Sequence, residues 1–169
     1  MTYQLPDRAL DGVDRERPRW LDAREERAWR ALQFLHLRVD GQLARRLAAE
    51  TDLSYAEYVV LVALTDHDDG RLRSFELGAT LGWEKSRVSH QARRMEQRGL
   101  VVREPCADDG RGAYVVVTDS GRRSIEAAAP SHVEAVRSLF IDHLTEAQLD
   151  QITEISEQVL TALGDRFDG

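Results

Sequence analysis

Hydrophobic positions along the chain recur mostly at steps of three and four, the spacing of one face of a helix. The first such pattern predicts a long amphipathic helix over residues 21–49. Shorter helices are predicted over 55–65, 75–81 and 85–98. The helix over 55–65 is nearly apolar throughout, so we expect it at the centre of the core. Residues 1–20 are polar and aperiodic, and they read as a flexible leader.

Two runs rich in β-branched residues, 100–104 and 113–118, come next in the chain. A loop containing Pro, Asp and Gly joins them, which predicts a β-hairpin with a long turn. Residues 71–73 could add a short strand. After the hairpin, a helix is expected from Thr118 to about His143.

Start and stop signals refine these boundaries. Ser54 with Glu57, and Thr145 with Gln148, have the spacing of capping boxes, so each pair predicts a helix start. Thr145 thereby opens a last amphipathic helix. Ser74 is expected to cap the helix over 75–81.

Glycine and proline mark further features of the helices. Gly82 is expected to end the helix over 75–81 in a left-handed conformation. Pro130, inside the helix that follows the hairpin, should kink or split it.

A helix rich in Arg and small polar residues followed by a β-hairpin is the order of elements in a winged helix. The predicted fold class is mainly α with a small β-wing. We divide the chain into a leader (1–20), an N-terminal dimerisation helix (21–52), a winged helix-turn-helix (53–118) and C-terminal dimerisation helices (119–169). The terminal helices are apolar with no obvious partner in the same chain, so we expect a homodimer.

The charge of the chain changes this picture only when its distribution is considered. The net charge of −7 argues against a nucleic-acid partner. Between Arg71 and Arg123, however, eleven basic residues stand against seven acidic ones, and the only lysine, Lys85, lies there. An acidic body with a basic face can still bind phosphate, because salt screens charges more than about 8 Å apart.

The predicted helix over 85–98 offers side chains suited to DNA. Val88, Ala92 and Met95 form its inner face, and the other positions point outward. Arg and Lys can bind guanine and Gln can bind adenine in the major groove, while further cations and hydroxyls bind phosphates. The candidate DNA-binding residues are Lys85, Ser86, Arg87, Ser89, His90, Gln91, Arg93 and Arg94. In the hairpin turn, Arg111 stands between Gly110 and Gly112, where a long cation suits a narrow minor groove.

The segment ELGATLGWEKSRVSHQARRMEQRGLVVREPCADDGRGAYVVVTDSGR resembles the MarR family of winged-helix transcription regulators. The resemblance extends from about Leu21 onward. It implies a homodimeric repressor that binds a pseudo-palindromic DNA operator and is released by a small, often aromatic, effector. It also implies that Asp109 orients Arg111 through a salt bridge. Glu84 departs from the pattern, which more often has Ser or another N-capping residue there.

The resemblance implies an effector pocket between the dimerisation and DNA-binding parts. The candidate residues there are Trp29, His36, Tyr55, Tyr58 and His132. Each of them could equally be an ordinary core or interface residue. Some relatives sense oxidants through a cysteine in the N-terminal helix region, and Cys106 does not match that position.

Other chemistries find little support in the sequence. His67 with its neighbouring aspartates reads as a solvated turn, and His132 and His143 lack the one-turn spacing of helical zinc ligands, so we expect no metal and no cofactor. No nucleophile elbow or phosphate loop is present, so an enzyme built on this scaffold is not expected. The remaining alternative is a winged helix that binds an acidic protein.

The location of the protein follows from what its sequence lacks. No apolar run approaches the ~20 residues that span a bilayer, and the N-terminus does not read as a signal peptide. We therefore expect a cytoplasmic protein with no membrane partner. With 42% hydrophobic and 31% charged residues, it should be globular rather than disordered.

Overall fold

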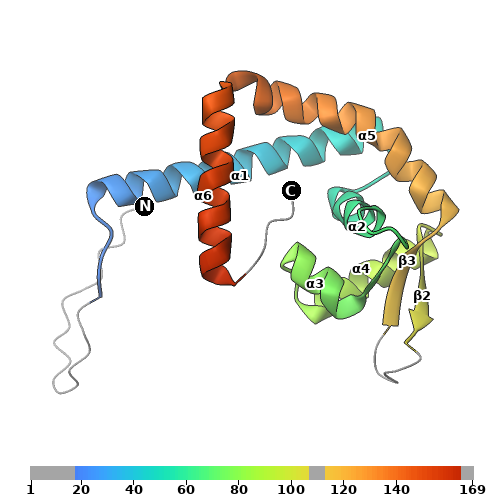
Figure 1. Cartoon of the computed structure of the whole chain (residues 1–169). Coiled ribbons are helices and arrows are strands. Elements are labelled where there is room, and N and C mark those ends of the chain that lie inside the picture. Colours follow the sequence, from blue (N-terminus) through green and yellow to red (C-terminus); the bar gives the residue numbers. More distant parts are fainter. Residues whose placement is uncertain (1–17, 107–112, 165–169) are drawn as a thin grey trace, which may run out of the picture. The chain divides into compact units, whose positions relative to one another are not determined.

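The computed structural model describes residues 18–106 and 113–164. It confirms the predicted fold class, mainly helical with a small antiparallel sheet (Figure 1). The elements are α1 (Ala23–Glu50), α2 (Tyr55–Thr65), β1 (Arg71–Arg73), α3 (Ser74–Leu81), α4 (Lys85–Gln97), β2 (Val101–Pro105), β3 (Ala113–Val117), α5 (Asp119–Leu139), the 3-10 turn η1 (Ile141–His143) and α6 (Glu146–Leu163).

The chain divides into two compact units, residues 1–35 and 36–169. In the first unit, the described residues 18–35 are all exposed. The helix begins at Ala23 rather than Leu21 because Asp22 caps it: its Oδ1 accepts hydrogen bonds from the backbone N–H groups of Arg24 and Glu25, at 2.7 and 2.8 Å.

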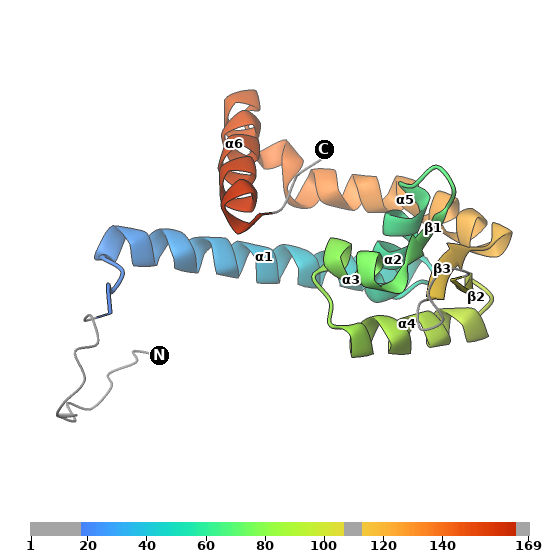
Figure 2. The ribbon, with the colours of Figure 1, turned by 60° about the horizontal axis from the view of Figure 1, so that its bottom comes forward.

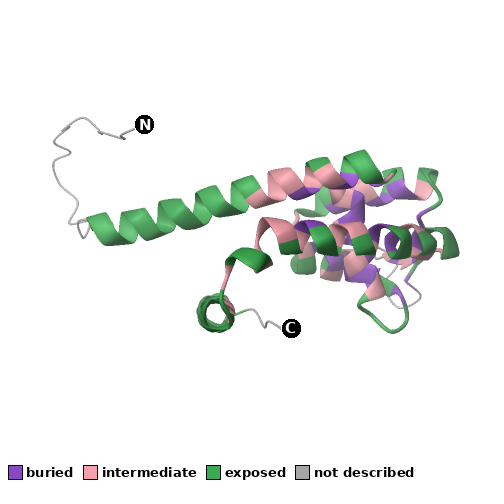
Figure 3. Ribbon diagram, turned by 90° about the horizontal axis from the view of Figure 1, so that it is seen from above, coloured by how far each residue is buried: buried purple, intermediate pink, exposed green. Residues whose placement is uncertain are grey.

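The core of the second unit surrounds α2, as the apolar pattern predicted. Leu61 and Leu64 of α2 are fully buried, and they belong to one hydrophobic cluster with residues from α3, α4, the sheet and α5. Figure 3 shows this concentration of buried residues, in contrast to α6, which is exposed along most of its length. Because α3 and α4 both contribute buried residues to this cluster, the core holds both helices in place.

The sheet has the strand order β1-β3-β2, and both pairings are antiparallel. Val115, in the central strand, faces Leu72 on one side and Arg103 on the other. The predicted short strand over 71–73 is therefore confirmed, and it closes one edge of the wing, the name we use for the β2–β3 hairpin.

The capping boxes at Ser54 and Thr145 are present, and Gly82 ends α3 with φ +61°. The expected cap at Ser74 was wrong. Arg73 is the N-cap of α3, and its backbone N–H donates to Glu76 at 2.8 Å. The Ser74 hydroxyl instead donates to the carbonyl of Ala113 at 2.9 Å, which ties α3 to the wing.

Helix α5 continues through Pro130 without splitting, and Figure 1 shows it bent rather than straight. It ends at Leu139, earlier than the expected His143. Phe140 leaves the helical conformation, with φ −140°, and a single 3-10 turn follows.

Candidate nucleic-acid interface

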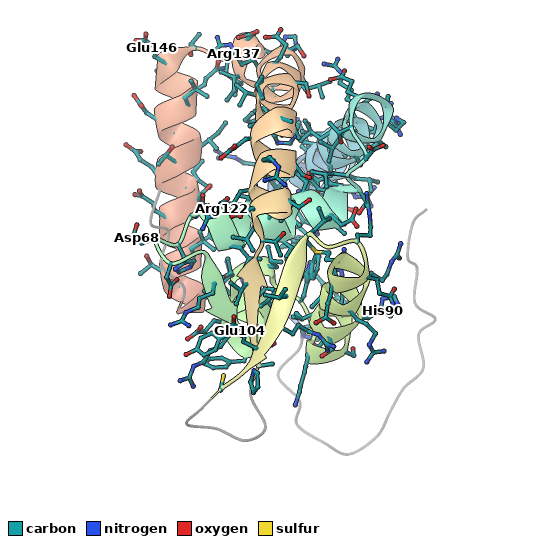
Figure 4. All side chains as sticks on the ribbon, turned by 90° about the vertical axis from the view of Figure 1, so that its right-hand side faces the viewer. Asp68, His90, Glu104, Arg122, Arg137 and Glu146 are labelled. Carbon is teal, nitrogen blue, oxygen red and sulfur yellow. The ribbon has the colours of Figure 1, made fainter. Side chains whose placement is uncertain are left out.

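Helix α4 presents one buried and one exposed face. Val88, Ala92 and Met95 are buried against the core, at most 3% exposed. Figure 2 shows α4 at an outer edge of the second unit, and Figure 4 shows His90 pointing away from the sheet. Of the candidate residues on the outer face, Ser89 and Gln91 are half-buried and the others are exposed, namely Lys85, Ser86, Arg87, His90, Arg93 and Arg94.

The cations of this face are available to a ligand. Among the residues that the structure describes, no carboxylate forms an ion pair with Lys85, Arg93 or Arg94. Glu84 is the N-cap of α4, but its side chain accepts no capping hydrogen bond. The start of α4 therefore keeps free N–H groups, which together with the helix dipole favour an anion.

Arg87 is arranged differently from the other cations. Its guanidinium carbon lies 4.1 Å from the centre of the Trp83 ring, which is a cation–π contact. Trp83 was not among the residues predicted from the sequence. The four-residue spacing between Trp83 and Arg87 was a signal for this contact. It was missed because Trp83 precedes the helix predicted over residues 85–98.

The C-terminal end of α4 is tied to the start of α2. Arg98, the C-cap residue, donates to Glu57 Oε2 at 2.6 Å and to the carbonyl of Asp52 at 2.7 Å. Glu57 is only 3% exposed. Burial raises the pKa of its carboxyl, but hydrogen bonds from the Ser54 N–H and hydroxyl and from Arg98 lower it more, so the pKa lies below its usual value.

The wing joins the other side of α4. Arg103 of β2 forms an ion pair with Glu96 of α4, at 2.8 Å between Nη2 and Oε2. At this junction, a concave surface of about 530 Å³ is lined, among the described residues, by the cations Arg73, Lys85 and Arg103 and by Trp83. Asp109 and Arg111, at the wing tip, lie outside the described residues.

Two of the five candidate effector residues come into direct contact. The rings of Tyr58 and His132 lie 4.3 Å apart, and His132 Nδ1 is buried with no hydrogen-bond partner among the described residues. Burial lowers the pKa of His132 and raises that of Tyr58. Tyr55 is half-buried, and its pKa is raised by burial and by the charge of Asp40.

The other two candidate effector residues are exposed. His36 pairs with Asp40 at 3.4 Å. Trp29 lies in the first unit and is 53% exposed. The structure therefore shows a local aromatic contact between α2 and α5.

The remaining candidate chemistries take ordinary structural positions. Cys106 is buried at the end of β2. Asp69 accepts a hydrogen bond from Arg71 at 2.9 Å, and this bond lowers the pKa of the Asp69 carboxyl. Within residues 18–106 and 113–164, no group of three His, Cys, Asp or Glu side chains could hold a metal ion. None of the helices described there combines the length and apolar character needed to cross a membrane.

Comparison with known proteins places this arrangement in a family. A family model described as the MarR family matches residues 51–112. The structure of AbsC, a MarR family transcriptional regulator from Streptomyces coelicolor, is 34% identical with a TM-score of 0.79; the match covers 86% of this chain and 98% of AbsC.

Two further proteins are similar to the chain. Sco3205, another MarR family regulator from Streptomyces coelicolor, solved in complex with DNA, is 36% identical with a TM-score of 0.80, over 86% of this chain and 92% of Sco3205. The organic hydroperoxide resistance transcriptional regulator of Bacillus subtilis is 23% identical over 103 residues, and the match covers 53% of this chain and 69% of that protein. The chain belongs to the MarR family of transcriptional regulators.

Proposed function

We propose that the chain is a homodimeric, sequence-specific DNA-binding protein that represses transcription and is released from its operator by a small-molecule effector. The observation that carries the proposal is the outer face of α4, where exposed cations without ion pairs in the described structure surround short polar side chains. The structure of Sco3205 in complex with DNA supports it.

The exposed polar side chains of α4 would bind the major groove. Ser86, Arg87, His90 and Gln91, in the first half of the helix, would meet base edges, while Lys85, Ser89, Arg93 and Arg94 would bind phosphates. Arg111 would enter the minor groove beside this site, oriented by Asp109. The DNA-binding part would be residues 53–118, and action on the genome would place the protein in the cytoplasm.

Exposed apolar residues on the terminal helices support the dimer. On α6, Ile152, Ile155, Val159 and Leu163 are between 38% and 70% exposed, at helical spacing. Leu32, Phe34, Leu35 and Leu37 of α1 are also exposed. Such surface is costly in water, and a second copy of the chain would cover it. Two copies would place their α4 helices in successive major grooves, about ten base pairs apart.

The effector part of the proposal is supported by the contact between Tyr58 and His132. These residues join α2 of the DNA-binding part to α5 of the dimerisation part, so a ligand that binds there could favour one arrangement of the two parts. The shift is limited by the ligand's difference in affinity for the two arrangements. A small aromatic molecule would fit the aromatic character of the contact.

Fluorescence anisotropy with the duplex upstream of the protein's own gene, and with a scrambled duplex, tests the proposal. We expect salt-dependent binding that prefers the native duplex by ~10³ or more. Equally weak binding to both duplexes, and to a library of randomised duplexes, would contradict sequence-specific recognition. That result would favour a winged helix that binds a protein.

A further inference from the structure

Trp83 is held firmly at the turn between α3 and α4. Gly82, with φ +61°, directs the chain into this turn, and the Trp83 N–H donates to the carbonyl of Gly78 at 2.8 Å. The Trp83 carbonyl oxygen lies so close to Gly78 that a Cβ there would be 2.9 Å away. Its half-buried side chain also packs against the hydrophobic core. The ring is therefore a fixed platform at the start of α4.

Arg87 lies over this platform in the first turn of α4. Its guanidinium carbon is 4.1 Å from the ring centre, inside the ~6 Å within which an aromatic ring attracts a cation. The residue is exposed, and it forms no ion pair with the carboxylates of the described chain. Trp83 is therefore the partner that orders Arg87 before any ligand binds.

A stacked arginine keeps its hydrogen-bonding capacity. The five N–H donors of a guanidinium lie in its plane, while a ring contact engages its face. The edge of the Arg87 group can therefore still donate two parallel hydrogen bonds, as guanine O6 and N7 require. A free arginine loses much rotamer freedom on binding, and a stacked one has already lost part of it.

We propose that Trp83 is a positioning residue that holds Arg87 in a prearranged orientation for reading one guanine in the major groove. This inference rests on the proposed function. It predicts that Trp83 affects how strongly the protein discriminates between bases at one position, and not only how strongly it binds DNA.

The test begins with the duplex that the wild-type protein enriches from a library of randomised duplexes. Each G·C pair of this duplex is replaced by A·T in turn, and the ratio of affinities gives the discrimination at each position. Arg87→Gln identifies the position that Arg87 reads. Trp83→Leu is expected to reduce discrimination at that position about two- to fivefold, the range of an exposed cation–π contact. Trp83→Phe keeps an aromatic face and should restore most of it.

Matched measurements separate this role from a structural one. In the Arg87→Gln background, Trp83→Leu should not change discrimination further, even if it lowers the unfolding temperature. The inference is overturned if Trp83→Leu weakens binding to all duplexes equally, if its effect persists without Arg87, or if wild type and Trp83→Leu discriminate alike. A wild-type protein that enriches no sequence would overturn the proposed function as well.

Discussion

Arg98 connects the C-terminal end of α4 to α2 through the buried carboxylate of Glu57. Glu57 Oε2 accepts hydrogen bonds from the N–H and the hydroxyl of Ser54, both at 2.8 Å, and from Arg98 at 2.6 Å. Arg98 also donates to the carbonyl of Asp52. Arg98→Ala removes both arginine hydrogen bonds and leaves a buried charge with only its capping partners. We predict a substantial loss of stability.

The magnitude follows from the exposure of the two side chains. Removing one partner of a fully buried pair costs about 3–5 kcal/mol, whereas exposed pairs contribute at most about 1 kcal/mol. The Glu57 side chain is 4% exposed and the Arg98 side chain 43%. We therefore expect a cost of about 2 kcal/mol, which corresponds to a fall in unfolding temperature of roughly 4–8 °C.

Urea unfolding followed by circular dichroism measures this cost, with all variants at one protein concentration because a dimer would unfold in a concentration-dependent way. Arg103→Ala is the matched control. The Arg103–Glu96 pair is 2.8 Å long, with side chains 38% and 35% exposed, and its loss should cost less than about 1 kcal/mol. Equal stability of the two variants would refute the reasoning from burial.

Three further predictions test other parts of the account. Gly121→Ala would place a Cβ against the carbonyl oxygen of Leu100 and should lower the free energy of unfolding by about 1–3 kcal/mol. In the control Gly41→Ala, the nearest atom to the new Cβ is 3.7 Å away, so stability should be unchanged or higher. Similar urea midpoints for the two variants would contradict this prediction. Burial lowers the pKa of His132, so the unfolded chain takes up its proton first and stability should fall as the pH drops below about 6.5. His132→Phe should weaken this dependence of stability on pH. If the variant's urea midpoint changed with pH as the wild type's does, the prediction would be contradicted. Val159→Glu, on the exposed face of α6, should convert a dimer to a monomer in light scattering, and a monomeric wild type would exclude the dimer.

Local sequence rules predicted the elements well where the partners of a residue are close in the chain. The capping boxes at Ser54 and Thr145 and the inner face of α4 depend on spacings of three and four, and all of them are present. Ser74 shows where such rules fail. It has the residue type of a cap, but its hydroxyl donates to Ala113, 39 residues away. A competing partner from a distant strand leaves no local signal.

The candidate interface likewise combines features that local spacing predicts with features that only the folded structure shows. The exposed face of α4 followed from helical periodicity, and the stack of Arg87 on Trp83 could have been found from the four-residue spacing. The ion pair between Arg98 and Glu57 joins residues 41 positions apart and required the folded structure. The roles of the outer residues in DNA binding remain predictions.

The salt dependence of DNA binding by Arg93→Ala tests most directly whether the outer face of α4 binds DNA. Each phosphate contact contributes about 0.9 to the slope of log affinity against log salt, so a dimer that loses two contacts should lose roughly two. Arg45→Ala removes the same charge from an exposed position on α1 and serves as control. The account predicts a reduced slope for Arg93→Ala and a wild-type slope for Arg45→Ala. Identical slopes for both variants would contradict it.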